Sequence, residues 1–183
     1  MKRSIVLCVV ISLWISQGIH AKENPPAKIS SYEAFISERG KVITKDTFQL
    51  MPLESLFKTL NICVIKMADV GKTEYFVQLS VSANNVEMST YISYRDIMDL
   101  KKALEKIDEG EYEDYDGGAE THEIFFITND GCKFGSYTTV QKNSVYIDLS
   151  ENYSEDIFYF EDMTAILGTL DEAIGMIEGL KGE

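Results

Sequence analysis

Residues 91–107 read YISYRDIMDLKKALEKI, and this stretch indicates how the chain folds. A strand is expected to end at Ile92, and a helix to begin after Ser93, whose hydroxyl can cap it with Asp96 three positions later. Four apolar residues then recur at helical spacing and share one face: Ile97, Leu100, Leu104 and Ile107. The stretch therefore predicts a strand that leads directly into an amphipathic helix.

The same arrangement recurs near the C-terminus, where residues 157–160 read IFYF and are followed by Glu161 and Asp162. The apolar residues of this second helix are Met163, Ile166, Leu170, Ile174 and Ile177. A constant offset relates the two copies, so that Asp96 corresponds to Asp162. We predict an α+β fold of two antiparallel β-meanders, each followed by a helix packed on a sheet face, as a duplicated ββββα pattern. One continuous sheet with both helices on one side is equally compatible.

Eight strands are predicted from apolar alternation and turn residues: 42–50, 56–67, 74–83, 86–92, 121–128, 132–139, 144–149 and 157–160. Strand 56–67 is apolar on both faces, so we expect it to be central and covered on both sides. Asn84-Asn85 and Asn129-Asp130-Gly131 are turn signals. The predicted core contains Ile62, Val64, Val77, Leu79, Ile97, Leu100, Leu104, Phe126, Ile166, Leu170 and Ile174.

The first 21 residues have the features of a secretory signal peptide. Lys2 and Arg3 precede an apolar run, and the predicted cleavage site follows Ala21. The run is shorter than the ~20 residues that span a bilayer. We therefore expect export to the periplasm or the exterior, with no membrane span in the mature chain.

After the signal, residues 22–40 should form a linker and a lead-in that is either a short helix or irregular. Residues 41–183 should form a single α+β domain of two halves, 41–107 and 121–183. The acidic segment 108–120 should join these halves as an exposed loop.

The chain is strongly acidic, with 17 Lys and Arg against 30 Asp and Glu, a net charge of −13. Because the signal holds two of the positive charges, the mature chain is more acidic still, and such a charge repels nucleic acid. Two cysteines survive cleavage, Cys63 and Cys132. An oxidising compartment permits a disulfide, but two cysteines do not define a framework, and the pairing stays open.

Motifs for catalysis and metal binding are absent from the sequence. The mature chain has one histidine, His122, and no CxxC, HExxH or GxSxG pattern. A thiol nucleophile would need Cys63 or Cys132 beside His122, which is conceivable only for Cys132 on the same hairpin. The carboxylates of Glu111, Glu113, Asp114 and Asp116 do not follow the spacing of a calcium loop. We therefore predict no catalytic, cofactor-binding or metal-binding residue and no cofactor.

Aromatic residues favour a binding role, since exposed tyrosines often contact proteins or glycans. Alternation places several of the following toward solvent: Tyr91, Tyr94, Tyr112, Tyr115, Tyr137, Tyr146, Tyr153, Phe158 and Tyr159. We expect an exported, non-enzymatic protein that binds a protein or a glycan through a sheet face and loops. The alternative is a small hydrolase or enzyme inhibitor that uses carboxylates in the cleft between the halves.

At residues 91–104 and at residues 126–135, which read FITNDGCKFG, the chain resembles small uncharacterised exported bacterial proteins. In these a strand runs into an acidic-capped helix and a later hairpin carries a glycine-rich turn. The resemblance implies no assigned activity. The element order is also similar to the strand-and-helix modules of the PUR and Whirly single-stranded nucleic-acid binders, but those modules use basic faces and this chain is acidic, so their function is not carried over.

Overall fold

The computed structural model describes residues 29–83, 86–112, 119–149 and 157–182. Several predicted features lie outside these ranges: the signal peptide, most of the linker, the turn at 84–85 and residues 113–118 of the acidic segment. Within the described ranges, no helix combines the length and the apolar content needed to cross a bilayer.

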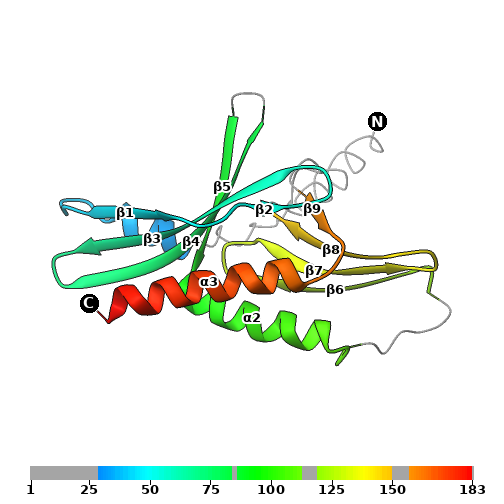
Figure 1. The fold of residues 1–183 in the computed structure, drawn as a ribbon. Coiled ribbons are helices and arrows are strands. Elements are labelled where there is room, and N and C mark those ends of the chain that lie inside the picture. The colour runs from blue at the N-terminus through cyan, green and yellow to red at the C-terminus, as the bar shows by residue number, and fades with distance from the viewer. Residues whose placement is uncertain (1–28, 84–85, 113–118, 150–156, 183) are drawn as a thin grey trace, which may run out of the picture.

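The described residues form an α+β fold with two antiparallel sheets and three helices (Figure 1). The first sheet contains β1 (Thr44–Gln49), β2 (Leu53–Glu54), β3 (Thr59–Asp69), β4 (Lys72–Ala83) and β5 (Val86–Ser93), in the order β1-β3-β4-β5 with β2 beside β3. The second sheet is the meander β6 (Thr121–Ile127), β7 (Lys133–Thr139), β8 (Asn143–Asp148) and β9 (Ile157–Phe160). The helices are α1 (Ser31–Ser37), α2 (Tyr94–Asp108) and α3 (Thr164–Lys181). The described strands therefore do not form the single continuous sheet that the sequence left open as an alternative.

Strand β3 is covered on both faces, as its sequence predicts. The side chains of Leu60, Ile62 and Val64 enter the main core. Those of Cys63, Ile65 and Met67 form a smaller cluster with Phe35 of α1. The lead-in is thus a helix whose role is to cover the outer face of the first sheet.

Helix α2 begins as predicted, because the Ser93 hydroxyl accepts the N–H of Asp96 at 3.2 Å. Three of its predicted core residues are fully buried: Ile97, Leu100 and Leu104.

The prediction of core residues was partly wrong for α3 and β6. Ala173 is fully buried at the centre of the inner face, whereas Ile174 and, in β6, Phe126 are only partly buried at the edge of the core.

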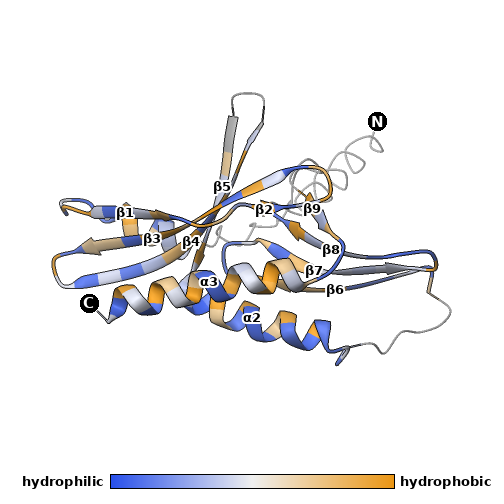
Figure 2. Ribbon diagram, viewed as in Figure 1, coloured by the Kyte–Doolittle hydropathy of each residue, from blue (hydrophilic) through white to orange (hydrophobic). Residues whose placement is uncertain are grey.

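Both halves of the chain contribute to the main core. Helix α2 packs on β4 and β5 and also on β6 and β7, while α3 packs on α2 and on β2 and β3 of the first sheet. Figure 1 shows the two helices side by side along the sheets, and Figure 2 shows apolar residues alternating with polar ones along both. The main-chain N–H of Leu56 donates to the carbonyl of Tyr159 at 2.8 Å, which links the two sheets. Each helix therefore stabilises strands of the other half.

Candidate functional site

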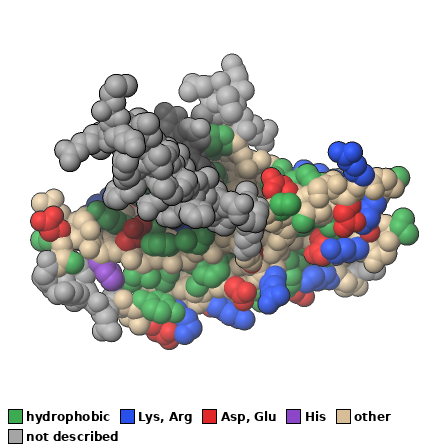
Figure 3. Space-filling view, turned by 180° about the vertical axis from the view of Figure 1, so that it is seen from behind, with side chains coloured by type: hydrophobic (Ala, Val, Ile, Leu, Met, Phe, Trp, Pro, Cys, Tyr) green, Lys and Arg blue, Asp and Glu red, His purple; other side chains and the backbone are tan. Residues whose placement is uncertain are grey.

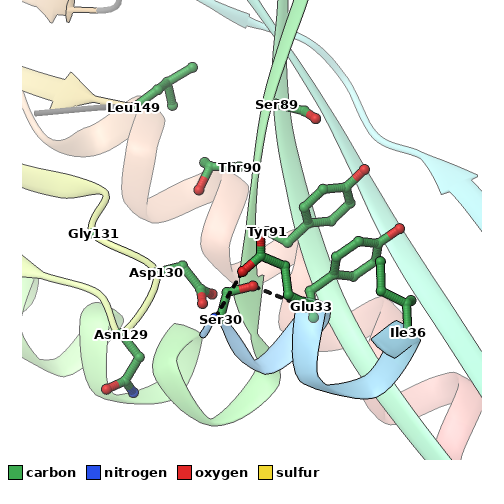
Figure 4. Close-up of a pocket in the computed structure, with 11 residues that line it drawn as sticks. Ser30, Glu33, Ile36, Ser89, Thr90, Tyr91, Asn129, Asp130, Gly131 and Leu149 are labelled. Atoms are coloured by element: carbon green, nitrogen blue, oxygen red, sulfur yellow. Dashed lines mark hydrogen bonds between the residues drawn. The ribbon is translucent and has the colours of Figure 1, made fainter. Parts of the chain in front are cut away.

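A pocket of about 580 Å³ lies where the two halves meet. Its walls are the start of α1, the residues of β5 around Thr90 and the turn at residues 129–131 (Figure 4). Most of the side chains that face it are polar: Ser30, Glu33, Ser89, Thr90, Asn129 and Asp130. Side chains from both halves of the chain converge on this space, which makes it the candidate site.

The start of α1 is held by acceptors from both halves. The Ser30 hydroxyl accepts the N–H of Glu33 at 3.0 Å, and the Glu33 carboxylate accepts the N–H of Ser30 at 3.2 Å, which makes a capping box. The carboxylate of Asp130 accepts the N–H of Ser31 at 3.3 Å. The first turn of a helix has main-chain N–H groups with no partner inside the helix, and these two carboxylates satisfy two of the nearby donors. One wall of the pocket is thereby fixed relative to the other.

The turn at 129–131 is positioned by α2. The carboxylate of Asp96, only 4% exposed, accepts the main-chain N–H of Asn129 at 3.3 Å and also its side-chain amide. Gly131 has φ 88°, a left-handed conformation that glycine adopts without strain. The sequence predicts Asp96 only as part of a helix cap, so this connection between the halves was missed. Nothing in the local sequence pairs Asp96 with Asn129.

The side of the pocket away from the turn is aromatic. The rings of Tyr32 and Tyr91 stack with centroids 3.6 Å apart and an interplanar angle of 3°. The ammonium of Lys45 lies 5.6 Å from one centroid and 5.5 Å from the other. Partial burial raises the pKa of Tyr32, the hydrogen bond with Tyr91 acts in the same direction, and Lys45 opposes both. The stack therefore places a flat aromatic surface beside the polar wall.

The chemistry that this arrangement supports is hydrogen bonding to a polar ligand. Glu33 and Asp130 are the two carboxylates in the cleft between the halves, and each accepts a main-chain N–H of the α1 start. The hydroxyls of Ser89 and Thr90 and the amide of Asn129 add donors and acceptors without charge. The two carboxylates already accept main-chain N–H groups of α1, and together with the uncharged groups they can bind and orient a polar ligand by hydrogen bonds.

The cysteine and histidine side chains do not form a nucleophilic pair. Cys132 is fully buried, and burial, with the nearby charges of Asp148 and Asp130, raises the pKa of its thiol well above the ordinary value. In the β6–β7 register His122 lies opposite Thr138, at the other end of the hairpin from Cys132. A protonated thiol far from the imidazole cannot act as the nucleophile that the sequence left conceivable for Cys132.

Cys63 and Cys132 lie in different clusters, and both are buried thiols. Cys63 belongs to the cluster beneath α1, where its thiol donates to the side-chain oxygen of Gln78 at 3.4 Å. Cys132 belongs to the main core on the other side of the sheet. The pairing that the sequence left open is thus not made in this structure.

Within the described residues, no group of three or more His, Cys, Asp or Glu side chains is arranged to hold a metal ion. Of the acidic segment, Glu111 pairs with Lys106 at 2.6 Å, while Glu113, Asp114 and Asp116 lie outside the described ranges. Among the predicted exposed aromatic residues, Phe158 and Tyr146 are buried, which corrects that expectation, and Tyr112 is exposed. Tyr115 and Tyr153 are not described.

Comparison of the chain with protein-family models, with curated proteins and with solved structures finds no match. The function is therefore inferred from the residues of the pocket and from the strand that borders it.

Proposed function

We propose that this chain is an exported, non-enzymatic protein that binds an extended peptide segment of a partner protein along strand β5. The observation that carries the proposal is the position of the pocket. Ser89, Thr90 and Tyr91 line it, and they belong to β5, which is the edge strand of the first sheet. An edge strand presents a row of main-chain donors and acceptors to which a peptide can add as a further strand.

The walls of the pocket carry groups that can distinguish the side chains of a bound peptide. Its volume of about 580 Å³ lies in the range of ordinary ligand sites. The Asn129 and Asp130 side chains can hydrogen-bond polar groups of a peptide, and the Tyr91 ring offers an apolar face. Because α1 and the turn are fixed by Asp130 and Asp96, the pocket is preorganised, which reduces the entropy lost on binding.

The hydrolase or inhibitor alternative has no comparable observation in its favour. The cleft carboxylates, Glu33 and Asp130, serve as acceptors for the α1 start, and the Cys132 thiol is held protonated in the core. A binding role is compatible with carboxylates that accept hydrogen bonds and with a buried, protonated thiol.

The test is to select extended peptides from a displayed random library against the mature protein and to measure their dissociation constants with two variants. Ser89→Arg places a long side chain in the pocket, and Ser82→Arg places the same side chain at an exposed position of β4 outside it. We expect Ser89→Arg to weaken binding about tenfold or more, which corresponds to ~1.4 kcal/mol. Ser82→Arg should leave the constant within about twofold. Equal effects of the two variants, or a library that yields no binder, would overturn the proposal.

We also propose that the chain reaches its partner outside the cytoplasm, after removal of residues 1–21. Support comes from the charged start at Lys2 and Arg3, the short apolar run and the small residue Ala21. Mass spectrometry of the exported material should give a chain that starts at Lys22. Recovery of exported protein with Met1 intact would contradict this.

We further infer that the two halves are related as a duplicated ββββα unit. In each half an antiparallel meander is followed by a helix with an aspartate near its start. Buried residues of the two helices correspond at one constant offset: Ile97, Leu100 and Leu104 with Met163, Ile166 and Leu170. Strand β2 and helix α1 would then be additions to the first half.

A further inference from the structure

The two sheets differ in whether a helix covers the outer face. Helix α1 covers the outer face of the first sheet, whereas no described helix packs on the outer face of the second sheet. The register of the second sheet places alternate residues on this outer face: Glu123, Phe125, Ile127, Lys133, Tyr137, Tyr146, Asp148, Ile157 and Tyr159. At the end of the molecule formed by the second sheet, hydrophobic side chains reach the surface and charged side chains lie around them (Figure 3). The face is aromatic and charged rather than uniformly polar.

A pocket of about 320 Å³ lies in this outer face and shares no described lining residue with the pocket along β5. Three tyrosines, two carboxylates and one lysine surround it: Tyr137, Tyr146, Tyr159, Glu123, Asp148 and Lys133. Tyr146 is 5% exposed although it points away from the helices, because it sits at the centre of this group. Gly135 lies opposite it in the register, and a Cβ there would come within 2.7 Å of the Phe125 Cβ, so this position does not fit a larger residue without a shift of β6.

The charge of this pocket is negative. The Tyr146 hydroxyl donates to the Glu123 carboxylate at 2.5 Å, which fixes both groups. Burial raises the pKa of Tyr146, and the charges of Glu123 and Asp148 act in the same direction, so the phenol stays neutral. Two carboxylates then face one ammonium, that of Lys133, whose nitrogen lies 5.8 Å from the ring centroid of Phe125. The acidic chain as a whole adds to the negative potential.

We propose that this pocket binds a small organic cation with a quaternary ammonium or alkylammonium group, free in solution. Aromatic ring faces attract such a group through their quadrupole, and neighbouring carboxylates complement its charge. The volume, at the lower limit of ligand sites, suits a single head group rather than a folded surface. A neutral sugar would gain nothing from the net negative charge, and an anion would be repelled by it.

The experiment is isothermal titration of the mature protein with choline and, separately, with 3,3-dimethyl-1-butanol, which has the same shape without the charge. We expect choline to bind saturably below about 10 mM and about tenfold more tightly than the alcohol. Glu123→Gln keeps a hydrogen-bond acceptor for Tyr146 and removes the negative charge. It should therefore weaken choline binding about fivefold or more and leave the affinity for the alcohol unchanged. Asp148→Asn should act in the same direction and serves if Glu123→Gln does not fold.

The matched control is Glu120→Gln, which removes one exposed charge just before β6 and outside the pocket. This variant should change the dissociation constant of choline by less than about twofold. Equal affinity for choline and the alcohol, no saturation by choline below about 10 mM, or an equal effect of Glu120→Gln and Glu123→Gln would overturn the proposal.

Discussion

Replacing Asp96 by alanine should weaken the attachment between the start of α2 and the turn at 129–131. The carboxylate is 4% exposed and accepts two hydrogen bonds from Asn129, one of them at 3.3 Å from the main chain. A hydrogen bond to a charged group contributes about 1.5 to 3 kcal/mol, and a carboxylate in the first turn of a helix adds about 0.3 to 1 kcal/mol. The 3.3 Å bond is long, and water can reach the exposed Asn129 when the carboxylate is lost. We therefore expect a loss of roughly 2 to 4 kcal/mol in the free energy of unfolding.

The chain provides a matched control in Asp162, the aspartate at the corresponding position before α3. It is exposed and accepts one N–H, from Thr164 at 2.9 Å. Asp162→Ala removes one exposed hydrogen bond just before the helix, so it should cost about 1 kcal/mol. Urea unfolding followed by circular dichroism measures both variants.

A double-mutant cycle isolates the contact itself. Asn129→Ala removes the side-chain donor but keeps the main-chain N–H, so the coupling with Asp96→Ala should be about 1 kcal/mol or more. If Asp96→Ala cost no more than Asp162→Ala, or if the cycle gave no coupling, the account of how the halves are joined would be refuted.

Three further predictions concern the core, one tyrosine and the surface charge. Leu104→Ala and Leu170→Ala should each lower the free energy of unfolding by about 2 to 5 kcal/mol because both side chains are buried, and unchanged urea midpoints would contradict this. The folded protein holds the Tyr146 proton above the ordinary pKa of 10.0, because the phenol is buried and bonded to a carboxylate. The stability that this proton contributes is therefore present below pH 10 and declines as the pH rises above it. Urea unfolding between about pH 8 and 11 should show a smaller decline of the unfolding free energy in Tyr146→Phe than in the unaltered protein. An equal dependence of the unfolding free energy on pH in both proteins would argue against a raised pKa of Tyr146. No gel shift of single- or double-stranded nucleic acid is expected at about micromolar protein. Lys101-Lys102 is the only adjacent basic pair after residue 21, and Lys101 is partly neutralised by carboxylates at 2.6 and 3.2 Å. A salt-sensitive shift would contradict this expectation.

The sequence predicted those parts of the fold that depend on neighbouring residues. The Ser93 cap, the buried face of α2 and the two covered faces of β3 follow from local spacing. Strand β2 was missed because two residues carry no periodicity. The pocket along β5 was missed because its walls are joined by contacts across 99 residues, from Ser31 to Asp130, and across 33 residues, from Asp96 to Asn129.

The aromatic residues show the same limit. Alternation assigns Tyr146 to the outer face of its sheet, and the register agrees. The strand pattern could not show that Tyr137, Tyr159 and Glu123 gather around it and bury it. Burial on an outer face depends on which strands are neighbours, and that order is a property of the whole sheet.

The packing of α3 on β2 and β3, and of α2 on β6 and β7, bears on how the chain can be divided. A cut between α2 and β6 would leave one piece without α3 and the other without α2, so each would expose apolar surface that only the other can cover. The Leu56–Tyr159 hydrogen bond would give the pieces a defined alignment when they meet. The protein is thus suited to fragment complementation, in which two inactive halves, mixed or attached to interacting partners, reassemble as a non-covalent heterodimer and report their proximity by the return of the folded core.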